Sequence, residues 1–145
     1  MSSKGRSIVV FVKCTLLGAI LCSFASCGAS SSQLPTFEVK GQIFQNGKPV
    51  PNATVVFHPT TKLGEDISNP RGTTNADGSF TLSTYGTADG APEGAYKITV
   101  EQWTTTNPEK GPESRLPSKL AKPEESGLTA KVASGKNEIP AIQLR

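Results

Sequence analysis

The chain has 145 residues, which is enough for one modest domain with short appendages. Only 35% of its residues are apolar and 6% are aromatic, while 14 are glycine and 11 are proline, so long buried helices are disfavoured. The net charge of +3 resides in residues 1–26, because 15 basic residues less the three found there leave 12 against 12 acidic ones. A neutral body lacks the basic surface that nucleic-acid binding requires, and we expect no nucleic-acid partner.

Residues 1–26 have the order of a secretory signal peptide. Lys4 and Arg6 form a basic start, an apolar run that includes Cys14–Ala25 follows, and small residues end it. The uninterrupted apolar run is shorter than the roughly 20 residues that a transmembrane helix needs. We therefore expect residues 1–26 to direct export and then to be removed.

The end of this leader, Phe24-Ala25-Ser26-Cys27, resembles the lipobox of bacterial lipoproteins. The resemblance implies that Cys27 becomes the lipidated first residue, although Phe24 stands where that family usually has leucine. Ordinary cleavage after Ala25 is the alternative, because residues 23–25 fit the small-x-small pattern. After cleavage Cys27 is the sole cysteine and has no partner for an internal disulfide, a situation that lipidation explains.

Residues 27–36 are predicted to be the lipidated cysteine and a flexible tether, because residues 28–33 are small and polar. The predicted location is exported and lipid-anchored in the cell membrane or outer membrane, facing the periplasm or the cell exterior. Gly28 is not the aspartate that favours inner-membrane retention in some bacteria, so outer-membrane sorting is permitted. The membrane, held through the lipid on Cys27, is the first predicted partner.

The remaining chain, residues 37–145, is predicted to be one domain of short strands joined by turns. Asn46-Gly47 and Asp77-Gly78 are turn signals that predict two hairpins, the first running from Phe37 to Phe57. Residues 104–127 contain four prolines and many charges, and they predict a long exposed connection whose only helix candidate is residues 118–122. The seven predicted strands are residues 37–45, 53–57, 71–75, 79–83, 95–103, 128–132 and 138–144.

This pattern predicts an all-β fold, a seven-stranded Ig-like β-sandwich. Pro140 interrupts the last strand and predicts an edge strand or a bulge there. Two-residue alternation selects the apolar side chains expected in the core. These are Val39, Ile43, Val55, Phe57, Phe80, Leu82, Tyr96, Ile98, Val100, Leu128, Val132, Ile142 and Leu144.

Several short motifs then follow one another in a known order. They are Val39-Lys40-Gly41, Gly47-Lys48-Pro49, Pro51-Asn52-Ala53-x-Val55, Thr74-x-x-Asp77-Gly78-x-Phe80 and Gly94-x-Tyr96-x-Ile98-x-Val100. Their order resembles the carboxypeptidase regulatory-like domain, a transthyretin-like β-sandwich, and in particular the short lipoproteins of this type in planctomycete-type bacteria. The resemblance covers about residues 37–145, including the late segment 116–129. It implies an exported, non-enzymatic accessory or binding module without catalytic residues.

The residues offer little support for catalysis or metal binding. His58 is the single histidine, and zinc sites need several nitrogen or sulfur ligands, which the mature chain lacks. Transthyretin-like hydrolases of 5-hydroxyisourate use several histidines and a C-terminal Tyr-Arg-Gly-Ser, whereas this chain ends at residues 142–145 with Ile-Gln-Leu-Arg. We expect no enzyme activity, no catalytic residues, no metal and no cofactor.

Loop carboxylates are a weaker possibility for a cation. Glu65-Asp66, Asp77 and Asp89 lie in predicted loops, but they lack the closely spaced pattern of a calcium loop. Asp77-Gly78 and Asp89-Gly90 are adequately explained as turns. Glu124-Glu125 lies in a proline-rich segment and is more typical of a solvated connector than of an acid–base pair.

Two aromatic residues are the candidate ligand-binding residues. Tyr85 lies in a predicted loop and Trp103 ends the most clearly patterned strand, so either ring could stack on a sugar. The alternative, which we favour from sequence, is that Trp103 covers an end of the sandwich. Any binding function is expected in the loops 60–70, 84–94 and 104–127, because loops carry function more often than strands do.

Three classes of function follow. The first is a membrane-anchored, non-catalytic envelope lipoprotein that acts as a structural or protein-interaction module. The alternative is a carbohydrate- or peptide-binding accessory domain that uses its loop aromatics. The third is an uncharacterised enzyme, which would have to gather His58 with two or more carboxylates in one pocket. The corresponding partner is an envelope protein or a glycan.

Overall fold

The computed structural model of the chain describes residues 33–64, 67–107, 109 and 111–145. The predicted signal peptide, Cys27 and the residues up to 32 lie outside this part, as do Glu65 and Asp66. Within the described ranges the chain forms thirteen short strands and one 3-10 helix, which confirms the all-β prediction and corrects the count of seven strands. None of the described helical segments has the length and apolar character needed to cross a membrane.

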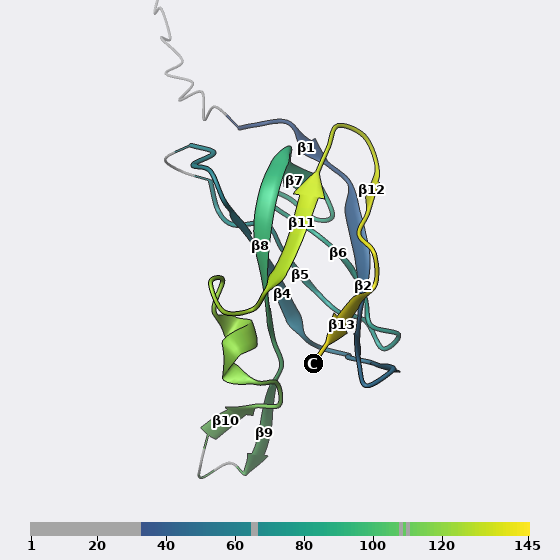
Figure 1. Cartoon of the computed structure of the whole chain (residues 1–145), viewed down its shortest axis with the longest axis vertical. Coiled ribbons are helices and arrows are strands. Elements are labelled where there is room, and N and C mark those ends of the chain that lie inside the picture. Colours follow the sequence, from purple (N-terminus) through teal and green to yellow (C-terminus); the bar gives the residue numbers. More distant parts are fainter. Residues whose placement is uncertain (1–32, 65–66, 108, 110) are drawn as a thin grey trace, which may run out of the picture. The chain divides into compact units, whose positions relative to one another are not determined.

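One sheet has four antiparallel strands in the order β11-β8-β4-β5 (Figure 1). They are β11 (Leu128–Val132), β8 (Gly94–Glu101), β4 (Thr54–Pro59) and β5 (Arg71–Thr73). The central ladder joins β4 to β8 and runs from Thr54 opposite Glu101 to Pro59 opposite Tyr96. The apolar face predicted for residues 95–103 is confirmed at Tyr96, Ile98 and Val100, which are buried, whereas Thr99, on the face predicted to be solvated, is buried as well.

The second sheet is centred on β2 (Val39–Gln45). Two short strands, β3 (Lys48–Pro49) and β6 (Ser79–Thr81), pair with β2 in the antiparallel direction. Two others, β12 (Asn137–Glu138) and β13 (Ile142–Leu144), pair with it in parallel. The interruption predicted at Pro140 is confirmed, because the chain leaves β2 between β12 and β13.

Two further strand pairs and one helical turn complete the described fold. At one end of β8, β1 (Thr36–Phe37) pairs with β7 (Ala91–Pro92), so the last residue of the expected tether belongs to a strand. Beyond the other end of β8, β9 (Trp103–Asn107) pairs with β10 (Gly111–Ser114), and the 3-10 helix η1 (Ser118–Ala121) follows (Figure 1).

The first predicted hairpin is wrong in its second strand. Asn46 and Gly47 adopt φ values of 50° and 76°, as an Asn-Gly turn requires, but the turn returns the chain only through β3. Asn52, with φ at 53°, makes another turn, and β4 then joins the other sheet. Val50 and Ala53 are buried at this crossing, so burial of their apolar side chains accompanies the change of sheet.

The second predicted hairpin has the expected turn, but its two strands do not pair with each other. Asn75 N donates to Ser79 O at 2.8 Å, and the Asp77 carboxylate accepts from Ser79 N at 3.0 Å. However, β5 pairs with β4 and β6 pairs with β2, so the two arms belong to different sheets. The bridge between Arg71 and Ser83 still links them.

The prediction of an exposed connection over residues 104–127 is confirmed for most of its described residues, but it is wrong about the lack of regular structure and about two leucines. This segment contains most of β9, all of β10 and η1, and it buries Leu116 and Leu120, which are 5% and 2% exposed. The helix candidate at residues 118–122 is confirmed as a single turn at Ser118–Ala121. Because the segment is polar and rich in proline, its two core leucines could not be recognised from composition.

The core is one cluster of 17 buried apolar residues that both sheets share. Twelve of the thirteen predicted core residues belong to it, and Leu128 packs against it partly buried. The Phe57 ring lies 6.4 Å from the Phe80 ring and 5.6 Å from the Tyr96 ring, distances typical of packed aromatic pairs. The residues missed from sequence are Val50, Ala53, Ala91, Leu116 and Leu120.

Candidate functional site

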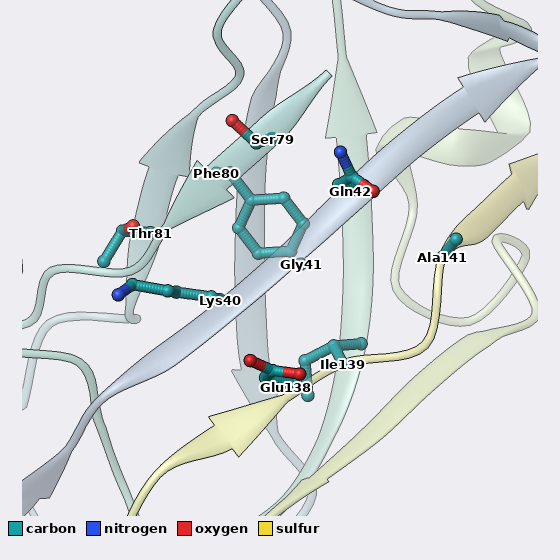
Figure 2. A pocket seen from close by; sticks show the side chains of 9 residues that line it. All are labelled: Lys40, Gly41, Gln42, Ser79, Phe80, Thr81, Glu138, Ile139 and Ala141. Carbon is teal, nitrogen blue, oxygen red and sulfur yellow. The ribbon is translucent and has the colours of Figure 1, made fainter. Parts of the chain in front are cut away.

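A shallow groove of about 410 Å³ lies along β2, between β6 and the segment that joins β12 to β13 (Figure 2). Its base is made where Phe80 packs on Gly41, the residue opposite it in the β2–β6 register. A Cβ atom on Gly41 would lie 2.6 Å from Phe80 Cζ, so only glycine allows this approach. The groove is lined by Lys40, Gly41, Gln42, Ser79, Phe80, Thr81, Glu138, Ile139 and Ala141.

Polar side chains cross this groove in rows set by the strand register. Lys40 lies opposite Thr81 on one side and opposite Glu138 on the other. Lys40 also forms an ion pair and hydrogen bond with Glu38, which raises the pKa of the lysine and lowers the pKa of the glutamate. The groove therefore presents one basic side chain, Lys40, and one acidic side chain, Glu138, on an open surface. Sequence reasoning missed it, although a glycine inside a strand is a signal of close packing.

His58 lies on β4, half-buried, in a small polar network. Its Nε2 lies 2.9 Å from Thr99 Oγ1 and its Nδ1 lies 3.1 Å from Asn69 Nδ2. Burial lowers the pKa of His58 below its usual value, so the neutral ring is favoured. Over the described part of the chain, no group of three or more His, Cys, Asp or Glu side chains could hold a metal ion.

The loop carboxylates have structural partners where the structure describes them. Asp77 accepts hydrogen bonds from Ser79 N and from Ser79 Oγ at 2.6 Å, and these bonds lower the pKa of Asp77. Glu124 pairs with Lys97, and Glu125 pairs with Lys122 at 2.8 Å. The turn and connector interpretations of these residues agree with this geometry.

Tyr85 belongs to a turn that Asp89 organises. The Asp89 carboxylate accepts hydrogen bonds from the backbone N–H groups of Thr84 at 2.7 Å, Tyr85 at 3.0 Å and Gly86 at 2.9 Å. The half-buried Tyr85 hydroxyl accepts a hydrogen bond from Leu34 N at 3.2 Å. Tyr85 therefore holds the segment before β1, and its hydroxyl is already engaged.

Trp103 is placed differently. It begins β9, lies opposite Ser114 of β10, and its side chain is 55% exposed. It is the one large apolar side chain with such exposure among the residues that the structure describes. Its Nε1–H donates to Glu101 Oε2 at 3.1 Å, which restrains the ring.

The interpretation that Trp103 covers an end of the sandwich is therefore wrong. Leu116 and Leu120, which follow the β9–β10 hairpin, enter the core cluster instead. The two candidate aromatics are not brought together. Tyr85 contacts the segment before β1, the strand that pairs with β7, whereas Trp103 comes two residues after the end of β8.

Comparison with known proteins gives limited likenesses. No family model matches the chain. The uncharacterized protein YlqB of Bacillus subtilis (strain 168) is 46% identical over 48 residues, which are 32% of this chain and 30% of YlqB. The chain thus matches less than a third of the length of that relative.

The solved structures that resemble the chain do so at low identity. A DUF3823 family protein from Parabacteroides merdae ATCC 43184 is 12% identical with a TM-score of 0.41, over 77% of this chain and 47% of that one. A 9R-lipoxygenase from Cyanothece PCC8801 is 14% identical with a TM-score of 0.40, over 76% of this chain and 16% of that one. The dioxygenase domain of a dioxygenase carbohydrate-binding protein fusion from Streptomyces sp. SirexAA-E is 18% identical with a TM-score of 0.36, over 80% and 84%. These scores assign neither a family nor an activity.

Proposed function

We propose that the chain is a lipid-anchored envelope protein whose β domain binds carbohydrate without catalysis, with Trp103 as the stacking surface. The observation that supports this proposal is the exposure of Trp103, because a binding role for the loop aromatics requires an accessible ring. Tyr85 does not meet this requirement as well, since its hydroxyl is occupied by Leu34 N. This choice favours the accessory-module alternative over the structural one.

The surroundings of Trp103 suit a sugar. An indole face is a flat apolar surface on which the C–H face of a pyranose can stack, and the ring also carries a polar N–H. Because that N–H is held by Glu101, the ring keeps one orientation and loses little conformational entropy when a ligand binds. The remaining oxygen of the Glu101 carboxylate can accept a hydrogen bond from a sugar hydroxyl.

The anchored location is supported by the leader and by Cys27. The proposal includes the assignment to the carboxypeptidase regulatory-like class and to short planctomycete-type lipoproteins, which the motif order between Val39 and Val100 supports. Because β1 begins at Thr36, a chain anchored at Cys27 would have only a short spacer, and the domain would stay close to the membrane surface.

The binding proposal is tested by co-sedimentation of the full chain with insoluble polysaccharide, for which purified peptidoglycan and cellulose are the probes. We expect Trp103→Ala to weaken binding about tenfold or more, because aromatic anchors dominate small interfaces. Trp103→Phe, which keeps a ring, and Tyr85→Phe, which keeps the half-buried ring, should both retain most of this binding. Binding that survives Trp103→Ala unchanged, or no binding to either probe, would contradict the proposal.

The anchor is tested separately. Cys27→Ala should move the protein from the detergent phase to the aqueous phase in detergent partitioning, with Cys22→Ala as the control that changes nothing. If the Cys27 variant partitions like the unaltered protein, lipidation at this residue is wrong. This outcome does not depend on whether Trp103 binds a glycan.

A protein-interaction role is the second candidate. The observation that favours it is the edge of β11, which has no neighbouring strand among the described residues and belongs to a different sheet from β9.

A further inference from the structure

The strand β11 forms one edge of the four-stranded sheet. It pairs with β8 over five residues, from Leu128 opposite Ile98 to Val132 opposite Gly94, and it has no strand on its other side in the described chain (Figure 1). An edge strand presents unpaired main-chain donors and acceptors to any extended segment that approaches it.

The register identifies the unpaired groups. Ala95 O accepts from Thr60 N, so Ala95 directs its main-chain groups toward the β4 side, and by alternation Lys97 does the same. Their partners on β11, Lys131 and Thr129, are therefore the non-hydrogen-bonded pairs. The N–H and C=O groups of Thr129 and Lys131 point away from β8.

One end of this edge is closed by a side chain. The Asn137 amide accepts from Ala133 N and donates to Ala133 O, each at 2.9 Å. The free stretch of outward main-chain groups therefore ends before Ala133.

The opposite edge of the same sheet is treated differently. Arg71 of β5 donates to Ser83 O at 2.9 Å and accepts from Ser83 N at 2.8 Å, so the start of that edge is bridged to the other sheet. Within the described residues, the fold thus covers part of the β5 edge and leaves the β11 edge open at Thr129 and Lys131.

A polar groove runs beside this open edge. It has a volume of about 310 Å³ and is lined by residues 129–131 of β11 and by residues 136–140. Five residues of extended chain span about 17 Å, so the stretch from Leu128 to Val132 accommodates a single strand of about that length.

The charges beside the edge indicate the side chains of the occupant. Lys131 is exposed, and its side chain makes no hydrogen bond or ion pair within the described structure. Lys136 also lines the groove. Glu138 is the acidic residue of the same lining, so two lysines stand against one glutamate and the net charge beside the free peptide groups is positive.

A second copy of the chain fits this edge poorly. Antiparallel pairing of two β11 strands through Thr129 and Lys131 would place both Lys131 side chains, together with both Lys136 side chains, around one interface. Four lysine side chains gathered at one interface repel one another and oppose this pairing. An acidic strand meets no such repulsion.

We infer that β11 is a docking edge for an extended, acidic segment of a partner protein, which adds a strand beside Thr129 and Lys131. The main-chain groups supply affinity for any extended peptide, and Lys131 selects a segment with a carboxylate next to it. This site is independent of the proposed glycan surface, because Trp103 lies on β9 and takes no part in the groove.

The test uses the full chain and a seven-residue peptide of alternating threonine and valine with a central glutamate, blocked at both ends. Amide hydrogen exchange at Thr129 and Lys131, followed by NMR, is the readout. We expect saturating peptide to slow exchange at both amides about tenfold or more, because they become strand-ladder donors. The same peptide with a central lysine should bind about fivefold more weakly or worse, which is the size of one exposed ion pair.

Matched variants separate the two parts of the inference. Thr129→Pro removes one outward N–H and should abolish peptide binding, whereas Thr73→Pro on the β5 edge should leave it unchanged. Lys131→Glu should weaken binding of the acidic peptide about fivefold, and Lys48→Glu should not. A peptide that is N-methylated at alternate amides should not protect the edge, and this control leaves the protein unaltered.

Three results would overturn the inference. Absence of protection with the acidic peptide removes the docking edge, and equal binding of the lysine peptide removes the acidic preference. Protection without peptide that increases with protein concentration, together with dimers in sedimentation, assigns the edge to a second copy. Trp103 fluorescence, measured in the same samples, should not change. The glycan proposal is therefore tested separately, by the co-sedimentation experiment.

Discussion

Phe57 and Trp103 show two ways in which this domain uses an aromatic residue on a strand. Phe57, on β4, is fully buried and packs against the rings of Phe80 and Tyr96. Trp103, on β9, is 55% exposed and has one side-chain hydrogen bond, to Glu101. The difference is that the core of both sheets surrounds β4, whereas in the described chain β9 pairs with its hairpin partner β10 alone. An aromatic side chain that a second sheet covers stabilises the fold, whereas one that no sheet covers is available for contact with a ligand.

The sharpest way to test this contrast is a pair of glycines, one in each region. A Cβ atom on Gly90 would lie 1.8 Å from Phe37 O, and φ there is 85°. Gly111 of β10 has a similar φ of 76°, but nothing lies within 4 Å of its Cβ position. We expect Gly90→Ala to cost more than about 4 kcal/mol of unfolding free energy, because the backbone of β1 must move. Gly111→Ala should cost only the conformational strain, about 1–2 kcal/mol.

Chemical denaturation of the full chain, followed by circular dichroism, measures both glycine variants. Equal losses of stability would mean that the close packing of β1 on the loop before β7 contributes little to the fold.

The aromatic pair itself comes next in size. Phe57→Ala should destabilise the domain by about 3–5 kcal/mol, because it leaves a cavity between the two sheets. Trp103→Ala should change the unfolding free energy by less than about 0.5 kcal/mol, as is usual for exposed positions. The same denaturation experiment decides this, and a large loss on Trp103→Ala would show that the ring serves the fold and would weaken the binding proposal.

A smaller effect on stability, its dependence on pH, is expected at the Asp89 turn before β8 and not at Trp103 after β8. Burial alone would raise the pKa of Asp89, but the backbone N–H groups of Thr84, Tyr85 and Gly86 together hold it below the ordinary value of 3.8. A carboxylate whose pKa is lowered by folding stabilises the native state above that ordinary value, and this contribution is lost as the pH falls below it. Asp89→Asn should therefore lower the melting temperature at neutral pH and make its acid decline less steep.

Melting curves recorded between about pH 2 and pH 7 check the Asp89 prediction. The Trp103 region has no part in this turn, so Trp103→Ala should leave the shape of the acid decline unchanged. An acid decline that Asp89→Asn leaves unaltered would contradict the role given to the three backbone donors.

Much of the core follows from local sequence, for a definite reason. Side chains alternate across a strand with a period of two, so Val39, Ile43, Val55 and Phe57 could be assigned inward from their spacing alone. The Asn46-Gly47 and Asp77-Gly78 turns were equally predictable, because few residues adopt positive φ at low cost. Pro140 marked the break between β12 and β13 because proline has no N–H to give to a ladder.

The strand partners were not predictable in the same way. The turn at Asn46-Gly47 indicated a hairpin, but the choice of β3 over β4 as its second strand depends on which sheet buries Val50 and Ala53. Leu116 and Leu120 lie in a segment whose prolines and charges suggested exposure, and only their packing against the rest of the core shows otherwise. Such contacts join residues far apart in the chain and leave no local pattern.

By itself, the sequence determined the all-β class, the positions of the main turns, most of the core side chains and the expectation of an exported, lipid-anchored chain, because each of these depends on local composition and spacing. Only the tertiary structure decided that Trp103 is exposed and Tyr85 engaged, that Phe80 packs on Gly41 beneath a groove, and that Thr129 and Lys131 lie on an open edge. The physical reason is that exposure and free hydrogen-bonding groups are properties of what lies next to a residue in space. A strand pattern identifies the strand, and its neighbours determine what that strand can bind.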